Sequence, residues 1–393
     1  MRVTPARGTV AAAAAALLAL TACGPGAQAR GGGSPSAAAG AAASSTSSPT
    51  TASPPPSTTT GTAAPTTAAA TSDPGVLTLA FGGDVHFEDY LRPLARDPHG
   101  LDELRSSLGA ADLAVVNLET AITERGAPIG KEFHFRAPAS ALDTLASAGV
   151  DAVSMANNHG ADYGAQGLRD TLAARRGSPV PIVGIGADAD DAFAPATLEA
   201  KGLEVAVLGA SQVFEMTLAN WSADADSPGI ASASPVDRLR AAVARAARTH
   251  DLVVVFLHWG LDYQACPDTL SRQTAEVLEA AGADVVVGGH SHRVNGAGWL
   301  GRSYVAYGLG NFVWWRSREP DSRTGVLTLE VDVATARGTR RTARSAVTDA
   351  TWTPMLVGRD GIPRVPGAAD RRRLTRVWEQ AGQCSGLASS PRS

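Results

Sequence analysis

Short apolar runs alternate with helix-like stretches through most of the chain after residue 75. Five runs have the length and composition of buried strands, at residues 76–81, 113–116, 152–155, 252–257 and 285–287. Apolar residues at three- and four-residue spacing predict helices near residues 101–109, 140–148, 165–176, 235–248 and 269–281. The segment 325–348, apolar and alternating over 325–333, predicts late antiparallel strands. This alternation predicts an α/β body whose strands are covered by helices.

The N-terminal 22 residues have the pattern of a secretory signal. A basic start precedes a 12-residue apolar core from Thr9 to Leu20. A membrane-spanning helix needs about 20 residues, so this core is too short, and a buried helix is the alternative for the run alone. The Leu-Thr-Ala-Cys sequence at 20–23 resembles the bacterial lipobox. That resemblance implies cleavage before Cys23, lipidation of its sulfur and an extracytoplasmic lipoprotein anchored to the cell membrane.

Residues 24–74 consist mainly of Ala, Ser, Thr, Pro and Gly, and no aromatic residue precedes Phe81. Such a segment has too little apolar surface to offset chain entropy, which predicts a flexible stalk unless the segment has no role. We therefore divide the chain into a signal peptide (1–22), a lipidated cysteine with its linker (23–74), a folded domain (75–350) and a C-terminal extension packed on that domain (351–393). The small polar residues from about 385 onward predict a frayed end.

Charge and cysteine content narrow the class of protein. The formal net charge is −4, and removal of the signal with Arg2 and Arg7 leaves −6. A non-specific nucleic-acid binder is expected to be basic, so we expect no nucleic acid as partner. If Cys23 carries the lipid, Cys266 and Cys384 remain as either a disulfide or two free thiols, and their spacing does not decide between them.

Each of the five strand-like runs is followed by residue types that bind metal ions. The residues are Asp84 and His86, Glu119, Asn158 and His159, His258, and His290 with His292. Ligands bind at the carboxyl ends of strands in open α/β sheets, so we expect these side chains to converge. Any single motif is equally well a turn or a surface group, but five of the eight histidines fall at such ends, which favours a metal centre.

The donor types indicate which ions would bind. Several histidines with one or two carboxylates suit Mn, Fe or Zn, whereas Ca and Mg prefer oxygen ligands. The number of donors exceeds what one ion needs. Two divalent transition metals that share a bridging carboxylate are therefore the expected cofactors.

As a set, these motifs resemble the calcineurin-like metallophosphatase superfamily, and more closely its CapA branch of poly-γ-glutamate capsule biosynthesis proteins. The residues that carry the resemblance are Gly83-Asp84, 116–119, Lys131 with 135–138, 157–159 with Asp162 and Gly164, 258–260, 289–292 and 307–312. They run in order through most of the folded part. The resemblance implies a four-layer α-β-β-α sandwich with two packed sheets and helices outside.

The resemblance also implies roles for the site residues. One metal would be held by Asp84, His86 and His292, and the second by Asn158, His258 and His290. The bridging carboxylate of the superfamily follows a glycine, whereas this chain has Asn117-Leu118-Glu119, so Glu119 is expected to bridge. His159 would act as general acid, oriented by Asp162, and the alternative for Asp162 is a helix cap.

These roles imply metal-assisted hydrolysis in which His159 protonates the leaving group. Lys131, His134 and Arg136 would clamp an anionic polymer or a phosphorylated substrate, unless they lie in a solvated loop. Asn311 would reach the site or else cap a turn.

The CapA resemblance implies a metal-dependent hydrolase of phosphoester or amide bonds in the metabolism of poly-γ-glutamate or a related envelope polymer, with a membrane synthetase complex as partner. The alternative is a non-catalytic, metal-containing polymer-binding component of a capsule synthesis or export complex. The chain contains neither a Walker-type loop nor a Gly-x-Ser-x-Gly elbow, which argues against ATP use and serine acyl chemistry.

Overall fold

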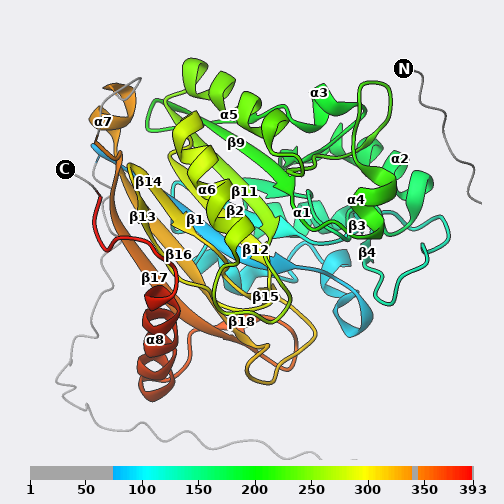
Figure 1. Cartoon of the computed structure of the whole chain (residues 1–393). Helices are drawn as coiled ribbons and strands as arrows, with labels where there is room; N and C mark the ends of the chain where they lie inside the picture. Colours follow the sequence, from blue (N-terminus) through cyan, green and yellow to red (C-terminus); the bar gives the residue numbers. More distant parts are fainter. Residues whose placement is uncertain (1–73, 339–343, 392–393) are drawn as a thin grey trace, which may run out of the picture. The chain divides into compact units, whose positions relative to one another are not determined.

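The computed structural model describes residues 74–338 and 344–391 (Figure 1). The expected signal peptide, Cys23 and the linker up to residue 73 lie outside the described residues. Within the described ranges, every helix is too short or too polar to cross a membrane.

Two large β-sheets form the centre of the folded part (Figure 1). The eight-stranded sheet has the order β18-β17-β16-β1-β2-β5-β6, with β15 also paired to β1. Its parallel strands are β1 (Val76–Val85), β2 (Leu113–Leu118), β5 (Ala152–Ser154), β6 (Ile182–Val183) and β15 (Asn311–Val313). Its antiparallel strands are β16 (Arg323–Asp332), β17 (Val347–Val357) and β18 (Pro363–Arg364), so the expected late antiparallel strands are confirmed.

The six-stranded sheet has the order β13-β14-β12-β11-β9-β8. Its four central strands are parallel, namely β9 (Leu203–Ser211), β11 (Leu252–Trp259), β12 (Val285–His290) and β14 (Ser303–Ala306). Its edges are the antiparallel strands β8 (Ala196–Ala200) and β13 (Ala297–Leu300). Two short pairs complete the strands, β3 (Ala121–Ile122) with β4 (Arg136–Ala137) and β7 (Ile185–Gly186) with β10 (Gly229–Ile230).

Successive residues of a strand point to opposite faces of its sheet, and this alternation builds three apolar layers. Val115 and Val254 belong to the layer between the two sheets. Val116 faces outward to a layer that includes α1 (Ser140–Ser147), α2 (Gly164–Arg175) and the turns η2 (Leu94–Arg96) and η3 (Asp102–Ser106), while the turn η1 (Asp89–Leu91) precedes η2 in the chain. Val255 faces outward to α3 (Ala189–Ala192), α5 (Asp237–Thr249) and α6 (Thr269–Ala281).

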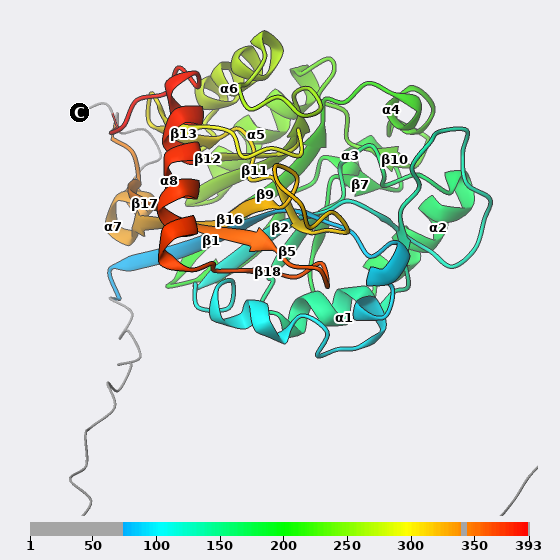
Figure 2. The same cartoon turned by 90° about the horizontal axis from the view of Figure 1, so that it is seen from below.

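The layers form the expected α-β-β-α sandwich, which is thereby confirmed. Figure 2 shows α1 on one side of the paired sheets and α5 with α6 on the other. The remaining helices are α4 (Met216–Trp221), α7 (Val333–Gly338) and α8 (Ala368–Gln383). The five strands and four of the five helices expected from sequence occur; the helix expected over 269–281 has the bounds of α6, and the others have an end shifted by one or more residues.

The fifth expected helix, over 101–109, is wrong. The structure has the short turn η3 there, flanked by further turns. Leu101, Leu104 and Leu108 are nevertheless all buried. A 3₁₀ turn also brings residues i and i+3 to one side, so the apolar spacing reports the buried face and not the helix type.

The C-terminal part is more closely joined to the body than expected. The expected boundary after residue 350 falls inside β17, which pairs along β16. On β17, Trp352 stacks against Trp378 of α8, with ring centroids 4.8 Å apart. Within the segment expected to fray from about residue 385, Trp299 and Ala388 exchange two backbone hydrogen bonds of 2.8 and 2.9 Å.

The two remaining cysteines form a disulfide between Cys266 and Cys384. Arg272 of α6 lies beside this link. Its guanidinium donates to the backbone oxygens of Cys384 and Ser385, each at 2.7 Å. The chain after α8 is therefore attached, by covalent and polar contacts, to α6 and the segment before it, on the helical side of the six-stranded sheet.

Candidate metal centre

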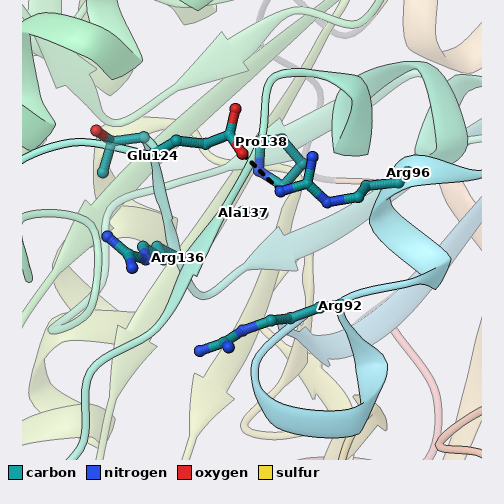
Figure 3. Close-up of a pocket in the computed structure, with 7 residues that line it drawn as sticks. Arg92, Arg96, Glu124, Arg136, Ala137 and Pro138 are labelled. Atoms are coloured by element: carbon teal, nitrogen blue, oxygen red, sulfur yellow. Dashed lines mark hydrogen bonds and ion pairs between the residues drawn. The ribbon is translucent and has the colours of Figure 1, made fainter.

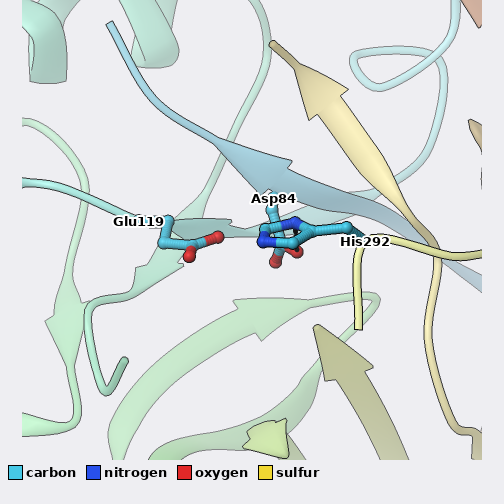
Figure 4. Close-up of side chains that lie close together, drawn as sticks. All are labelled: Asp84, Glu119 and His292. Carbon is cyan, nitrogen blue, oxygen red and sulfur yellow. Dashed lines mark ion pairs between the residues drawn. The ribbon is translucent and has the colours of Figure 1, made fainter. Parts of the chain in front are cut away.

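The polar residues that follow the predicted strands meet at one edge of the paired sheets. Asp84 lies in β1, Glu119 directly follows β2, His258 lies in β11 and His290 ends β12. Figure 4 shows the side chains of Asp84, Glu119 and His292 pointing toward one another from separate segments. Parallel strands end at the same edge of a sheet, which is why residues far apart in sequence converge here.

Glu119 stands between the two expected ligand groups. One ligand atom each of Asp84, Glu119 and His292 lie within 4.8 Å of one another. On the other side, His258 Nε2 is 3.6 Å from Glu119 Oε1 and 2.8 Å from Asn158 Oδ1. The carboxylate is thus within reach of both groups.

Several ligand atoms of this cluster are buried and have no hydrogen-bond partner. These atoms are both carboxylate oxygens of Glu119, Nε2 of His86 and Nδ1 of His290. Buried polar atoms are normally paired, because leaving them unpaired costs free energy. Divalent ions bound in the cluster would give each of these atoms a partner. The atoms are imidazole nitrogens and carboxylate oxygens, which are common ligands of such ions. The residues therefore fit a metal centre.

Neighbouring groups hold Asp84 and His258 in place. Asn117 Nδ2 donates to Asp84 Oδ1 at 2.8 Å and lies 3.2 Å from His258 Nδ1. Asp84 Oδ2 accepts from the His290 backbone N–H at 3.0 Å. Gly289 makes this approach feasible, because a Cβ there would lie 2.2 Å from Asp84 Oδ1.

The loop after β12 carries two histidines with unusual backbone. His290 has φ of 89° and His292 has φ of 52°, in the left-handed region that non-glycine residues seldom adopt. Such conformations cost free energy and persist where surrounding structure holds them. Here they aim both side chains into the cluster.

His159 belongs to a chain of polar contacts. Its Nδ1 lies 2.7 Å from Asp162 Oδ2, and its Nε2 faces Glu119 Oε1 at 3.7 Å. Phe135 stacks on the His159 ring, with centroids 4.0 Å apart, and on the His86 ring at 4.3 Å. Asp162 does not cap α2, since the N-cap residue is Tyr163 and makes no side-chain capping bond. Asp162 therefore contacts His159 as expected, and the helix-cap alternative is wrong.

Lys131 and Asn311 both contact residues of the cluster, so Asn311 reaches the site and Lys131 has a site residue as its partner. Lys131 Nζ is 2.7 Å from Asp162 Oδ1 and 2.6 Å from the backbone oxygen of Asn158. Asn311 Oδ1 is 2.7 Å from His292 Nδ1, and its amide donates to the backbone oxygen of Asp321. Both side chains are thus committed to orienting site residues.

His134 and Arg136 have other partners. His134 Nε2 is 2.5 Å from the backbone oxygen of Ile129. Arg136 lines a cavity with Arg92 and Arg96. The three predicted clamp residues, Lys131, His134 and Arg136, therefore each contact a different group.

Burial shifts the pKa values of the cluster toward neutral forms. It raises the pKa of Asp84 to about 6 and, together with the Asp84 charge, holds the pKa of Glu119 well above its usual range. It lowers the pKa of His290 and of His292 to about 4. Burial also holds the pKa values of three further histidines well below their usual range, namely His86, His159 and His258. Neutral imidazoles are ready to bind metal, while the carboxyl groups must lose protons first.

A pocket lined by aromatic residues lies at His159 and His292 and was not predicted from the sequence. It contains Phe133, Tyr263, Trp314 and Trp315, which surround His159 and His292 together with Arg316. Each aromatic residue lies within a few positions of a motif residue. This closeness in sequence could have indicated that the rings lie near the site, but it does not show which way a ring points.

A family model described as bacterial capsule synthesis protein PGA_cap matches residues 78–314. This range contains all seven expected metal ligands. The chain is 29% identical over 260 residues to the PGA biosynthesis protein CapA of Bacillus subtilis, covering 63% of this chain and 67% of that protein. It is 32% identical over 197 residues to the capsule biosynthesis protein CapA of Bacillus anthracis, covering 48% and 47%.

A probable polyglutamine synthesis accessory protein of Mycobacterium tuberculosis is 32% identical over 220 residues, covering 52% of this chain and 56% of that protein. The chain thus spans about half the length of the B. anthracis and M. tuberculosis relatives.

Solved structures give distant likenesses. A hypothetical protein from Thermus thermophilus matches with a TM-score of 0.42 and 16% identity, covering 71% of this chain and 98% of that one. A 5'-nucleotidase from Candida albicans matches with a TM-score of 0.40 and 10% identity, covering 78% and 58%. Likenesses this distant do not bear on activity. The family model, in contrast, covers more than half of the chain, so this protein belongs to the bacterial capsule synthesis family PGA_cap.

Proposed function

We propose that this protein is an extracytoplasmic, membrane-anchored lipoprotein that hydrolyses a phosphoester or amide bond in a capsule or related envelope polymer at a two-metal centre. The observation that carries the proposal is the Glu119 carboxylate, which is buried, unpaired and flanked by two sets of ligand side chains. Family membership supports the capsule setting. The lipid anchor rests on the Cys23 motif alone.

The two ligand groups are those implied by the superfamily resemblance, and the closeness of Asp84, Glu119 and His292 supports the first of them. Asp84, His86 and His292 would hold one ion, and Asn158, His258 and His290 the other, with Glu119 shared. Divalent Mn, Fe or Zn bound there would polarise the scissile bond and lower the pKa of water.

His159 is the residue suited to move a proton. Asp162 holds its Nδ1, so Nε2 is the atom available to the leaving group. An anionic substrate beside the ring favours the imidazolium form, which protonates the leaving oxygen or nitrogen. Phe135 stacks on the ring and keeps water from one of its faces.

The substrate would be an anionic polymer or a phosphorylated envelope component. Three curated relatives carry names that refer to PGA, capsule or polyglutamine synthesis. A membrane synthetase complex as partner rests on the CapA resemblance.

A second candidate function is a non-catalytic, metal-containing polymer-binding component of a capsule synthesis or export complex. The observation in its favour is that Lys131 pairs with Asp162, so this charged group is not available to a substrate. The paired His159 and Asp162 argue against it, because a purely structural metal site needs no oriented proton donor.

Two measurements on the full-length protein separate these functions. Metal content by mass spectrometry is expected to give two ions per chain. Hydrolysis is assayed with bis(p-nitrophenyl) phosphate and with γ-linked pentaglutamate. Turnover of at least one substrate that requires added Mn, Fe or Zn supports the hydrolase. Bound metal without turnover of either substrate would favour the binding component.

A further inference from the structure

A cavity of about 160 Å³ lies next to the metal centre and carries no assigned role. It is lined by Arg92, Arg96, Arg136, Thr123, Glu124, Ala137 and Pro138. Figure 3 shows the three arginine side chains around one space; Arg92 directly follows η1, Arg96 ends η2 and Arg136 lies in β4. We call it the arginine cavity.

The charges around the arginine cavity do not cancel. Arg92 pairs with Glu88, and Arg96 Nη2 lies 2.5 Å from Glu124 Oε1. The Arg136 guanidinium lies over the Tyr163 ring, 4.8 Å from its centroid, and has no carboxylate at ion-pair distance among the described residues. Three guanidinium groups and two carboxylates leave one net positive charge, at Arg136.

The cavity and the metal centre share a wall. Phe135, which directly precedes Arg136, stacks on the rings of His86 and His159. The Arg136 backbone N–H donates to Glu88 Oε2 at 3.3 Å, and the Glu88 backbone N–H donates to His86 Nδ1 at 3.0 Å. Neighbouring residues of an extended segment face opposite sides, so the Phe135 side chain faces the metal centre and the Arg136 side chain faces the cavity.

The chemistry of the arginine cavity suits an oxyanion. A guanidinium group presents paired N–H donors that match a carboxylate or a phosphate. Arg92 and Arg96 have exposed side chains, and the carboxylate partner of Arg96 lies at the rim, since the Arg96 and Glu124 side chains are each 59% exposed. Exposed pairs of this kind are weak, so an incoming anion can share their donors at small cost.

We propose that the arginine cavity is an oxyanion site that holds a carboxylate or phosphate group of the same anionic chain on which the metal centre acts. The assignment of that chain as substrate rests on the function proposed above. The site itself rests on the unpaired Arg136 and on the wall shared with the centre. The anionic substrate chain would then be bound through one of its anionic groups while the reaction takes place at another position along it.

Calorimetric titration of the full-length, metal-loaded protein tests the site, with γ-linked pentaglutamate and inorganic phosphate as probes. Arg136→Gln is expected to weaken binding of at least one probe about tenfold, as one lost charge-assisted pair implies. Arg96→Gln changes an exposed residue and is expected to weaken the same probe by a smaller factor. Arg240→Gln, on the exposed side of α5, is the matched control and is expected to leave binding unchanged. Melting curves verify that each variant is folded.

The outcomes separate this proposal from the proposed function. The probe that depends on Arg136 identifies the anion as carboxylate or phosphate. The same dependence measured in a His290→Ala background, with its metal ligand removed, would support a site distinct from the centre. Arginine-dependent binding without any turnover would support the cavity while the hydrolase proposal fails. Wild-type protein that binds neither probe, or equal affinities for wild type, Arg136→Gln and Arg96→Gln, would overturn the cavity proposal.

Discussion

The metal centre and the C-terminal attachment, meaning the Cys266–Cys384 disulfide with Arg272, are two regions that differ in how their ionisable groups are paired. At the centre, both Glu119 oxygens, His86 Nε2 and His290 Nδ1 are buried without partners. At the attachment, the Arg272 guanidinium is matched to backbone oxygens, and a disulfide closes the link. Unpaired buried groups cost stability and paired ones contribute to it. We infer that the centre is built for binding and the attachment for stability.

Glu119→Gln is expected to have the largest effect on metal binding at the centre. An amide cannot bridge two cations as a carboxylate does, so bound metal and turnover are both expected to fall to background. The metal-free variant is expected to melt no lower than metal-free wild type, because the lost group was unpaired. Mass spectrometry and melting curves measure both effects. Glu330→Gln, at an exposed position, is the control. Full metal content in Glu119→Gln would refute the bridging role.

His159→Ala separates chemistry from metal binding within the centre. The variant is expected to keep its metal and to lose about 10²- to 10⁴-fold in kcat, the usual contribution of a positioned proton donor. Steady-state kinetics with metal analysis measure this result. His99→Ala, which changes an exposed histidine, should behave as wild type. An active His159→Ala enzyme would remove this residue from the mechanism.

At the attachment, the double substitution Cys266→Ser, Cys384→Ser should act only on stability. The disulfide closes a sequence separation of 118 residues, and its loss is expected to cost about 2–5 kcal/mol in the free energy of unfolding. Denaturant unfolding measures this cost. Metal content should stay unchanged in the folded variant. Loss of metal from the folded variant would show that the two regions are coupled.

Lys131→Met probes a residue that acts through Asp162. The pKa of the Asp162 carboxyl is raised to about 6 because burial raises it by more than the nearby Lys131 ammonium lowers it. Its loss is expected to lower kcat about 10- to 100-fold with little change in KM, as for other outer partners of metal sites. Lys201→Met is the matched control, since these are the only lysines in the chain. A change confined to KM would instead show that Lys131 contributes to substrate binding.

The pH dependence of metal affinity gives the smallest predicted effect. Burial raises the pKa values of Glu119 and Asp84, so the metal-free centre holds protons that the ion must displace. Affinity should therefore rise with pH, by up to about tenfold per unit for each proton released. The histidines already have lowered pKa values and should release none above pH ~6. Calorimetry in buffers of different ionisation enthalpy counts these protons, and zero release at pH 7 would contradict the account.

The sequence predicts the strands that deliver the ligands because those strands are buried on both faces. All eight residues of β11 and all six of β12 are buried, so they read as continuous apolar runs. β9 is also buried except at Glu204, but it ends in Ser211 and is followed by Gln212, which are not the metal-binding residue types that mark the other strand ends.

Side-chain partners are harder to predict than strand ends. Lys131 reads as a substrate clamp, yet its partner Asp162 is 31 residues away and becomes its neighbour only in the folded chain. Whether Cys266 and Cys384 form a disulfide could not be predicted for the same reason, because these residues also become neighbours only in the folded chain. It depends on where α8 ends relative to α6, and sequence spacing carries no such information.

Anomalous diffraction from crystals of the full-length protein grown with Mn or Zn tests the central claim most directly. The account predicts two peaks that flank the Glu119 carboxylate, one beside Asp84 and His292 and the other beside Asn158 and His258. A single peak away from Glu119, or no peak at this edge of the sheets, would contradict it.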